Sequence, residues 1–348
     1  LQQNVESVEL SRKLLELATE GGSGGSGAKL AHCFLTTSGA MANENGLKLA
    51  FHKKPGATRI LAFEHAFAGR TMALSQITDK AAYRVGLPAV LAVDYVPFFD
   101  GERPAESIAK AVEVLRRHMA RFPGAHAALW CEFVQGEGGF YAGSREFFEA
   151  IFKAAREKQV AVVADEIQTF GRTSKLFAFQ HFGVEEWVDI VTVGKMLQVC
   201  ATLFTDALKP GPGLLSQTFT AATSALFGAK AMLSALESAG AFGREGRNMQ
   251  VNARFATRLA EIEGRHAGWI RGPFGLGGMI AFTPFDGADE KVKKLLAALF
   301  ENGVVAFLNG SNPARVRFLP PVPVLTDEHI DEVCAILEQT MAQIAGGG

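Results

Sequence analysis

Two apolar runs of the sequence carry charged residues at or near their carboxyl ends. VAVVADEI (160–167) contains Asp165 and Glu166, and DIVTVGK (189–195) ends in Lys195. Runs this dense in aliphatic residues are typical of strands that helices cover on both faces. Because ligands of an open parallel sheet lie outside the carboxyl ends of its strands, these side chains are the first candidates for chemistry. The alternatives are a structural ion pair or a helix cap for the acids and a solvated strand end for the lysine.

A third segment, TTSGAMANE (36–44), places Ser38 and Gly39 directly before a predicted helix that continues to Lys53. Free amide groups at a helix start, with close approach at a glycine, form an anion site suited to phosphate, although an ordinary helix cap has the same pattern. A phosphate anchor, a buried acid and a strand-end lysine are together the parts needed to hold pyridoxal phosphate. In this interpretation the lysine forms a Schiff base with the aldehyde, and the acid keeps the pyridine nitrogen protonated.

The composition excludes several other classes of protein. Of 348 residues, 48% are hydrophobic and 20% are charged, which predicts a sizeable core, and the net charge is -1. We therefore expect no nucleic acid partner, and no membrane insertion because no apolar run approaches the ~20 residues of a span. The four cysteines lie far apart and without metal-ligand spacing, so we expect no metal site, no disulfide framework and a reducing cytoplasm. They are Cys33, Cys131, Cys200 and Cys334.

Short apolar strands alternate with longer amphipathic helices through the first part of the chain. Further strands are predicted at 59–64 and 127–133, and helices at 104–122 and 144–159, the second with Ser144 as its N-cap. This order predicts an α/β fold with a mostly parallel sheet and helices on both faces.

The pattern changes near residue 241, so we predict a large domain over 1–240 and a smaller C-terminal α+β domain over 241–348. GGSGGSG (21–27) has the composition of a flexible linker. The chain begins with Leu and enters a helical pattern at once, from which we predict that an N-terminal segment is missing. The smaller domain is expected to contain helices at 246–265, 289–301 and 326–343 and strands at 278–283, 303–308 and 314–319.

The sequence resembles the class III (fold type I, ω-amino acid) aminotransferases, which include ornithine, acetylornithine, 4-aminobutyrate and lysine 6-aminotransferases. The resemblance spans nearly the whole chain from residue 8, and its longest motif is DEIQTFGRTSKLFAFQHFGVEEWVDIVTVGK (165–195). Shorter motifs are SGAMANENGLKLA, FAGRT, EFVQGEGG, SQTFTAATSAL and VRFLPP, while GKMLQVC looks most like the lysine 6-aminotransferases. The resemblance implies a fold type I pyridoxal-phosphate-dependent transferase with a sheet of the seven-stranded type.

The resemblance also implies roles for individual residues around the cofactor. Lys195 would be the Schiff-base residue and the base that moves the substrate proton, and Asp165 would pair with the pyridinium nitrogen. Thr218 matches a phosphate contact made from the partner subunit, which implies a homodimer with shared active sites. The other implied contacts are Ser38, Gly39 and Ala40 to the phosphate, Phe67 stacked on the ring, Gln168 to the ring hydroxyl and Glu132 behind the ring.

Substrate selection is implied for three further residues. Arg317 matches the carboxylate-binding arginine of the family, Glu137 the glutamate that pairs with it, and Arg70 is a candidate for a second carboxylate contact. Such a pair would act as a switch, since a dicarboxylate acceptor needs the arginine free and a diamine-type donor needs it masked. Without the resemblance, Arg317 would be interpreted as a charge on an exposed strand face.

The sequence departs from the family at Ala68, at Phe133 and in TAATSA (220–225), and none of these changes removes the cofactor chemistry. We predict an aminotransferase that moves the amino group of an ω-amino acid of the lysine, ornithine or 4-aminobutyrate type to 2-oxoglutarate by a ping-pong mechanism. The alternatives are an α-amino donor, an aminomutase-like reaction on the same cofactor, and a noncatalytic or engineered scaffold with this fold.

Overall fold

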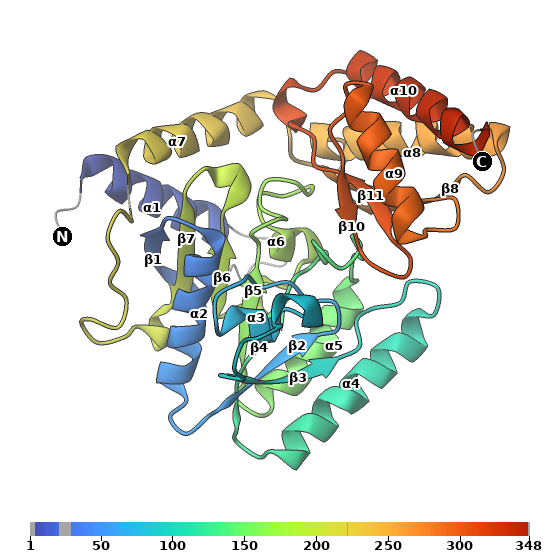
Figure 1. Ribbon diagram of the computed structural model, residues 1–348. Helices are drawn as coiled ribbons and strands as arrows, with labels where there is room; N and C mark the ends of the chain where they lie inside the picture. The colour runs from blue at the N-terminus through green and yellow to red at the C-terminus, as the bar shows by residue number, and fades with distance from the viewer. Residues whose placement is uncertain (1–3, 21–28, 221, 347–348) are drawn as a thin grey trace. The chain divides into compact units, whose positions relative to one another are not determined.

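The computed structural model describes residues 4–20, 29–220 and 222–346, which form two compact units (Figure 1). The linker expected at 21–27 lies outside the described residues. Unit 1 takes the described residues of Leu1–Phe133, Gly143–Gly171 and Leu176–Ser234, and unit 2 takes those of Val134–Ala142, Arg172–Lys175 and Ala235–Gly348.

The observed units differ from the two continuous domains expected at 1–240 and 241–348. The later boundary falls at Ser234, inside helix α7 (Thr223–Ser238), and two short segments of the earlier chain belong to unit 2. Hydrogen bonds tie these segments to unit 2, because the Gly278 N–H donates to the Arg172 carbonyl over 2.8 Å and the Arg315 side chain donates to the Gly139 carbonyl. Contacts between residues this far apart in sequence leave no trace in a hydropathy pattern.

Unit 1 is built on a seven-stranded sheet in the order β1-β7-β6-β5-β4-β2-β3. Only β7 runs antiparallel to its neighbours, so the mostly parallel sheet expected from the sequence is confirmed. Its strands are β1 (Leu30–Thr36), β2 (Arg59–Phe63), β3 (Ala92–Val96), β4 (His126–Cys131), β5 (Ala161–Asp165), β6 (Ile190–Val193) and β7 (Cys200–Thr205).

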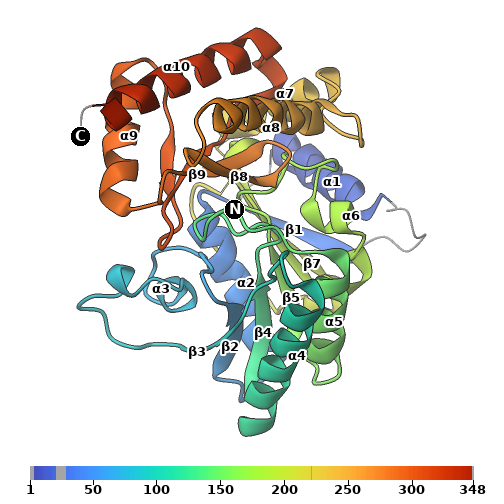
Figure 2. The same ribbon diagram turned by 90° about the vertical axis from the view of Figure 1, so that its right-hand side faces the viewer.

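Helices cover both faces of this sheet. Figure 2 shows α2 on one side of the strands and α4 and α5 on the other. The predicted N-cap of α5 is confirmed, since the Ser144 hydroxyl accepts a hydrogen bond of 3.2 Å from the Phe147 N–H. The helices before the C-terminal part are α1 (Val5–Thr19), α2 (Gly39–Lys53), α3 (Leu74–Ile77), α4 (Pro104–Arg121), α5 (Arg145–Arg156), α6 (Ala178–Phe182) and α7.

Helix α2 lies close against the middle of the sheet because its inner side carries small residues. A Cβ at Gly46 would already be in van der Waals contact, 3.4 Å from a methyl group of Ile190 and 3.6 Å from the Trp130 ring, so a side chain larger than alanine would push the helix away. The Thr202 hydroxyl also donates to the Ala42 carbonyl over 2.8 Å. This packing sets the height of the helix start relative to the strand ends.

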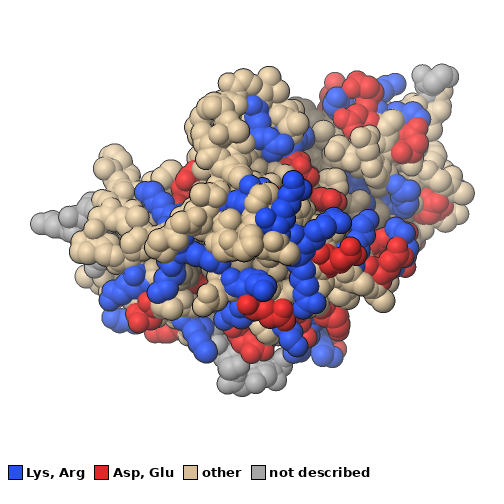
Figure 3. Space-filling model, turned by 90° about the horizontal axis from the view of Figure 1, so that it is seen from below, with Lys and Arg blue, Asp and Glu red and all other residues tan. Residues whose placement is uncertain are grey.

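Basic and acidic side chains lie side by side on the face shown in Figure 3, as the near balance of 35 basic and 36 acidic residues predicts. Within the described part of the chain, no helix is both long and apolar enough to cross a membrane.

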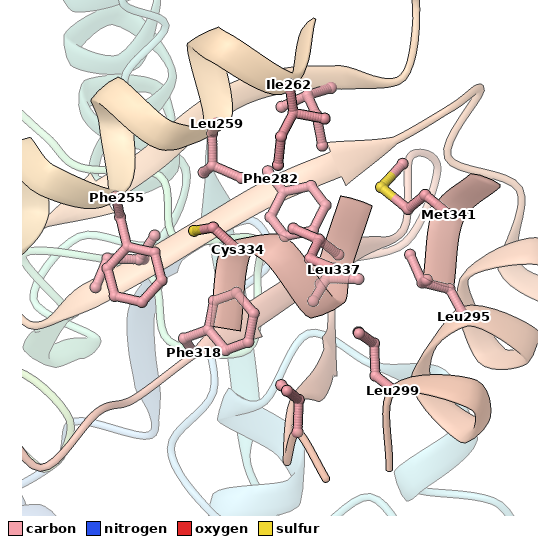
Figure 4. Packing of buried hydrophobic residues seen from close by; sticks show 14 of the residues in the cluster. Phe255, Leu259, Ile262, Phe282, Leu295, Leu299, Phe318, Cys334, Leu337 and Met341 are labelled. Atoms are coloured by element: carbon pink, nitrogen blue, oxygen red, sulfur yellow. The ribbon is translucent and has the colours of Figure 1, made fainter. Parts of the chain in front are cut away.

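Unit 2 contains an antiparallel four-stranded sheet in the order β10-β11-β9-β8. Side chains from α8, α9 and α10 pack with the inward side chains of β9 and β11 into one apolar core, part of which Figure 4 shows. The elements are α8 (Arg247–Arg265), β8 (Ile270–Leu276), β9 (Met279–Pro284), α9 (Asp289–Glu301), β10 (Phe307–Asn309), β11 (Arg315–Phe318) and α10 (Asp327–Gly346).

The sequence pattern gave no indication of β8, and it placed β10 too early, at 303–308. Gly272 and Pro273 stand where the register between β8 and β9 shifts, and both residue types are depleted in strands, so the pattern of β8 is weak. Gly303 has a φ of +87°, which belongs to a turn rather than to a strand start.

The core of unit 2 leads to a stability prediction with a matched control. Phe282 is fully buried among Phe318 and other core side chains, whereas Phe300 is 70% exposed. Phe282→Ala should lower the free energy of unfolding by about 3–5 kcal/mol because it leaves a cavity. Phe300→Ala should change it by less than about 0.5 kcal/mol. Urea unfolding of the two variants checks this, and equal losses would contradict the observed packing.

Candidate active site

The turn after β6 places Lys195 in an unusual backbone conformation. Lys195 has a φ of +44° and begins a short 3-10 turn that ends at Leu197. A non-glycine residue held in this region costs of order 1 kcal/mol and persists only where its surroundings force it. The turn is tightly enclosed, since a Cβ at Gly194 would lie 2.7 Å from the Cys200 sulfur and 3.1 Å from a methyl of Ile167. The Lys195 side chain itself is exposed in the single chain.

Asp165, the last residue of β5, is 4% exposed and accepts hydrogen bonds from three different elements. Its carboxylate receives the Ile167 N–H over 3.1 Å, the Trp130 indole N–H over 3.2 Å and the Asn43 amide over 2.7 Å. Burial raises the pKa of Asp165, while these three donors and the charge of Lys195 act against that rise. The structure therefore brings the predicted acid and the predicted lysine within electrostatic reach of each other.

Glu166 lies in different surroundings from its neighbour, because successive residues of a strand point to opposite faces. Its carboxylate accepts the Phe179 N–H over 2.9 Å and the Thr169 hydroxyl. It is fully buried, and burial raises the pKa of Glu166 to about 7. Glu166 therefore connects β5 to α6, and Asp165 is the acid that lies near Lys195.

The start of α2 has the form expected of an anion site. The Ser38 hydroxyl caps the helix by accepting the Met41 N–H over 3.2 Å, and Gly39 is the first helical residue. A Cβ at Gly39 would lie 3.1 Å from Ile167, so the helix start touches the loop that follows Asp165. The first amide groups of a helix have no intrahelical acceptor, and they carry a partial positive charge.

A hydrogen bond joins Phe67 directly to Glu132, and both residues are assigned to the cofactor site by the resemblance. The Phe67 N–H donates to the Glu132 carboxylate over 2.9 Å, and Glu132 is 7% exposed. Gln168 is buried as well. Arg70 is exposed, and its guanidinium lies 4.7 Å from the centre of the Tyr83 ring, so its described contacts are with aromatic side chains.

Asn43 was not identified from the sequence, although its side chain joins Asp165 to the segment that contains Ala68. Its side-chain amide donates to the Ala68 carbonyl and to Asp165, each over 2.7 Å. Trp130, the second residue missed, holds the same carboxylate from β4. The only sequence signal for Asn43 is a polar residue on a helix side that otherwise carries small and apolar residues.

In unit 2, Arg317 and Glu137 form the ion pair that the resemblance implies. Arg317 Nη2 lies 2.7 Å from the Glu137 carboxylate, and Arg317 Nη1 donates to the Gly136 carbonyl over 2.9 Å. The Arg317 side chain is 11% exposed, so the alternative of a charge on an exposed strand face is wrong. Arg315, which was not singled out from the sequence, is 3% exposed and donates to the Gly139 carbonyl.

Thr218 lies on the surface between β7 and α7, and no described contact joins it to the cluster around Asp165. Among the described residues, no group of three or more His, Cys, Asp or Glu side chains could hold a metal ion.

The chain is similar to known proteins over nearly its whole length. The family model described as "Aminotransferase class-III" matches residues 1–341. Acetylornithine aminotransferase of Methanocaldococcus jannaschii is 30% identical, over 98% of this chain and 79% of that relative. Diaminobutyrate--2-oxoglutarate transaminase of Nocardia farcinica is also 30% identical, over 98% of this chain and 78% of that relative. Lysine aminotransferase from M. tuberculosis, a solved structure of 24% identity, shares the fold with a TM-score of 0.87 over 99% of this chain and 81% of that one.

The raised pKa of Glu166 predicts a specific pH dependence of stability. A carboxyl with a folded pKa of about 7 and an ordinary value of 4.5 keeps its proton longer when folded, so its contribution is fully present below pH 4.5 and is lost as the pH rises to about 7. Relative to Glu166→Gln, the parent should lose up to about 3 kcal/mol of unfolding free energy over this window. Urea unfolding at several pH values measures the difference. The exposed Glu146→Gln is the control, and a parent and Glu166→Gln that respond alike to pH would contradict the prediction.

Proposed function

Because the chain belongs to the class III aminotransferases, we propose that it transfers the amino group of an ω-amino acid to 2-oxoglutarate with pyridoxal 5'-phosphate as cofactor. The names of the relatives support both substrates, since one acts on acetylornithine and the other on diaminobutyrate and 2-oxoglutarate. The single observation that carries the proposal is the electrostatic interaction of Lys195 with the buried Asp165 at the ends of adjacent strands.

The residues of unit 1 fit the proposed cofactor. The capped start of α2 offers free amide groups of Gly39 and Ala40 to a phosphate, and Asp165 offers a fixed carboxylate to a ring nitrogen. Phe67 is held by Glu132 and presents an aromatic ring for stacking, and the buried Gln168 would reach the ring hydroxyl. When bound, pyridoxal phosphate supplies an aldehyde that reacts with amines and a ring that accepts electron density.

Each side chain then has a task in the proposed reaction. Lys195 Nζ would hold the cofactor at rest, and once the substrate amine has displaced it, the free amine would accept the proton released from the substrate carbon and return a proton later. Asp165 keeps the ring nitrogen protonated, and its three donors prevent the carboxylate from turning away. The strained turn at Lys195 supports this role, since a fixed backbone limits where the amine can reach.

Arg317 and Glu137 are proposed to select between the two substrates of the ping-pong cycle. With an ω-amino donor, the glutamate holds the guanidinium, as it does in the described chain. With 2-oxoglutarate, the distal carboxylate takes the planar fork of the arginine in place of the glutamate. Arg70 is retained as a candidate second contact, since it is exposed.

The proposal includes a homodimer, in which Thr218 of one subunit contacts the phosphate in the other site. The exposure of Thr218 in the single chain supports this role, because a partner subunit has access to it. A cytoplasmic location, expected from the cysteines, remains part of the proposal, and all four cysteines are free thiols.

The assignment of Lys195 is tested with Lys195→Ala, using Lys209→Ala as an exposed-lysine control. Because one amine both holds the cofactor and moves the proton, turnover should fall by at least about 10³-fold. Borohydride treatment should fix the cofactor to the peptide that contains residue 195 in the parent and the control only, which peptide mass spectrometry measures. Near-parent turnover by Lys195→Ala would refute the assignment.

The switch is tested with Glu137→Ala, which leaves Arg317 without its carboxylate partner. The free arginine should favour glutamate over ω-amino donors, so the ratio of ω-donor to glutamate rates should fall by about ten-fold. The two half-reactions are followed separately through cofactor absorbance, with Glu146→Ala as the control. An unchanged ratio would show that the pair does not select substrates.

A further inference from the structure

The segment 134–142 of unit 2 is a closed loop with Glu137 near its tip. A bridge pairs Val134 with Ala142, the Gln135 N–H donates to the Tyr141 carbonyl over 2.9 Å, and the Phe140 N–H donates to the Gln135 carbonyl over 2.9 Å. These contacts close the base of the loop. The position of its tip, which carries the glutamate, depends on what holds the residues beyond the base.

Two arginines of β11 hold the tip on either side of Glu137. Arg315 and Arg317 are two residues apart in one strand, so both side chains leave the same face of the sheet. Arg317 Nη1 donates to the Gly136 carbonyl, and Arg315 Nη1 donates to the Gly139 carbonyl. The loop is therefore fixed at the residue before the glutamate and again two residues after it.

Arg315 is a buried cation whose described contacts include no ion pair. Its guanidinium lies 3.4 Å from the centre of the Phe274 ring and 4.2 Å from that of Tyr141, a residue of the loop itself. Burial lowers the pKa of Arg315 to about 10, so it stays charged at neutral pH. A buried charge is costly unless its surroundings compensate it, and here the Gly139 carbonyl and two aromatic faces provide that compensation. Displacing the loop would remove the carbonyl and one of the two rings.

Gly139 allows this close approach. Its φ of +131° is unfavourable for other residues, and a Cβ would lie 2.9 Å from the Tyr141 ring and 3.3 Å from Arg315 Nη1. A side chain at this position would strain the backbone and push the guanidinium away. The close contact therefore depends on both residues, because Gly139 must lack a side chain and Arg315 must provide the guanidinium.

We propose that Arg315 is a positioning residue that sets donor preference by holding the loop 134–142 so that Glu137 stays on Arg317. This inference rests on the proposed function of the Glu137–Arg317 pair. Arg315 acts through the Gly139 carbonyl and the Tyr141 ring, so it contributes without touching substrate. When the loop loosens, Glu137 leaves Arg317 more often, and the arginine is then free for a dicarboxylate.

The test compares Arg315→Met, which keeps length and loses the donors, with Arg244→Met, which removes an exposed arginine of the same unit. Hydrogen exchange at the Gly310 amide, which donates to the Glu137 carbonyl at the tip over 3.1 Å, should be at least about ten-fold faster in Arg315→Met than in the parent. The ratio of ω-donor to glutamate rates should fall in the same direction as in Glu137→Ala, through a higher KM for the ω-donor at similar kcat. Arg244→Met should change neither quantity.

Two further variants keep the proposal testable if Arg315→Met does not fold. Arg315→Lys retains one donor and should recover part of the loop protection and part of the donor preference. Gly139→Ala should reproduce the faster exchange, since it displaces Arg315 from the opposite side. Unchanged hydrogen exchange at the Gly310 amide in folded Arg315 variants overturns the proposal, even if no donor is turned over. Faster exchange with an unchanged ratio of ω-donor to glutamate rates overturns it as well. An inactive parent would instead refute the proposed function alone.

Discussion

The rest of unit 1 depends on the hydrogen bonds that hold the buried carboxylate of Asp165. A carboxylate at 4% exposure is costly unless it is hydrogen-bonded, and three elements provide its donors: Asn43 from α2, Trp130 from β4 and the Ile167 amide from the loop after β5. Each donor constrains its own element. Together with the packing at Gly46 and the Thr202–Ala42 hydrogen bond, the carboxylate thereby sets how high α2 stands over the sheet, and with it the position of the free amide groups at the helix start.

The same arrangement explains why Lys195 lies in a strained turn. The turn after β6 leads into β7, which pairs antiparallel with β6, so the chain must reverse within a few residues. Ile167 and Cys200 leave no room for a side chain at Gly194, and Lys195 takes the positive φ. Strain at such a residue is retained where packing over-determines the backbone. The reversal keeps the lysine close enough to Asp165 for its charge to oppose the rise in pKa that burial causes.

In unit 2, two arginines lie on one face of β11, and the described contacts give a carboxylate partner to only one of them. Arg317 has Glu137, whereas Arg315 is stabilised by a carbonyl and two aromatic rings. An ion pair can be exchanged for another carboxylate, because a ligand can supply equivalent oxygens. A cation enclosed by backbone and rings has no such replacement. Arg317 therefore makes a contact that a ligand can replace, whereas the contacts of Arg315 are fixed.

The sequence by itself determined the α/β order, the long helices and the end-of-strand placement of Asp165 and Lys195, because hydrophobic periodicity, caps and strand ends are local properties. The motifs determined the family for the same reason, since they are contiguous in the chain. Tertiary structure alone decided that Asn43 and Trp130 hold Asp165, that Arg315 fixes the Glu137 loop, and that 134–142 belongs to unit 2. Tertiary structure also decided that β8 is a strand. Gly272 and Pro273 weaken its sequence pattern, and the strand forms through its pairing with β9. These features arise from contacts between residues far apart in the chain, and no local pattern encodes which distant donor will reach a buried acceptor.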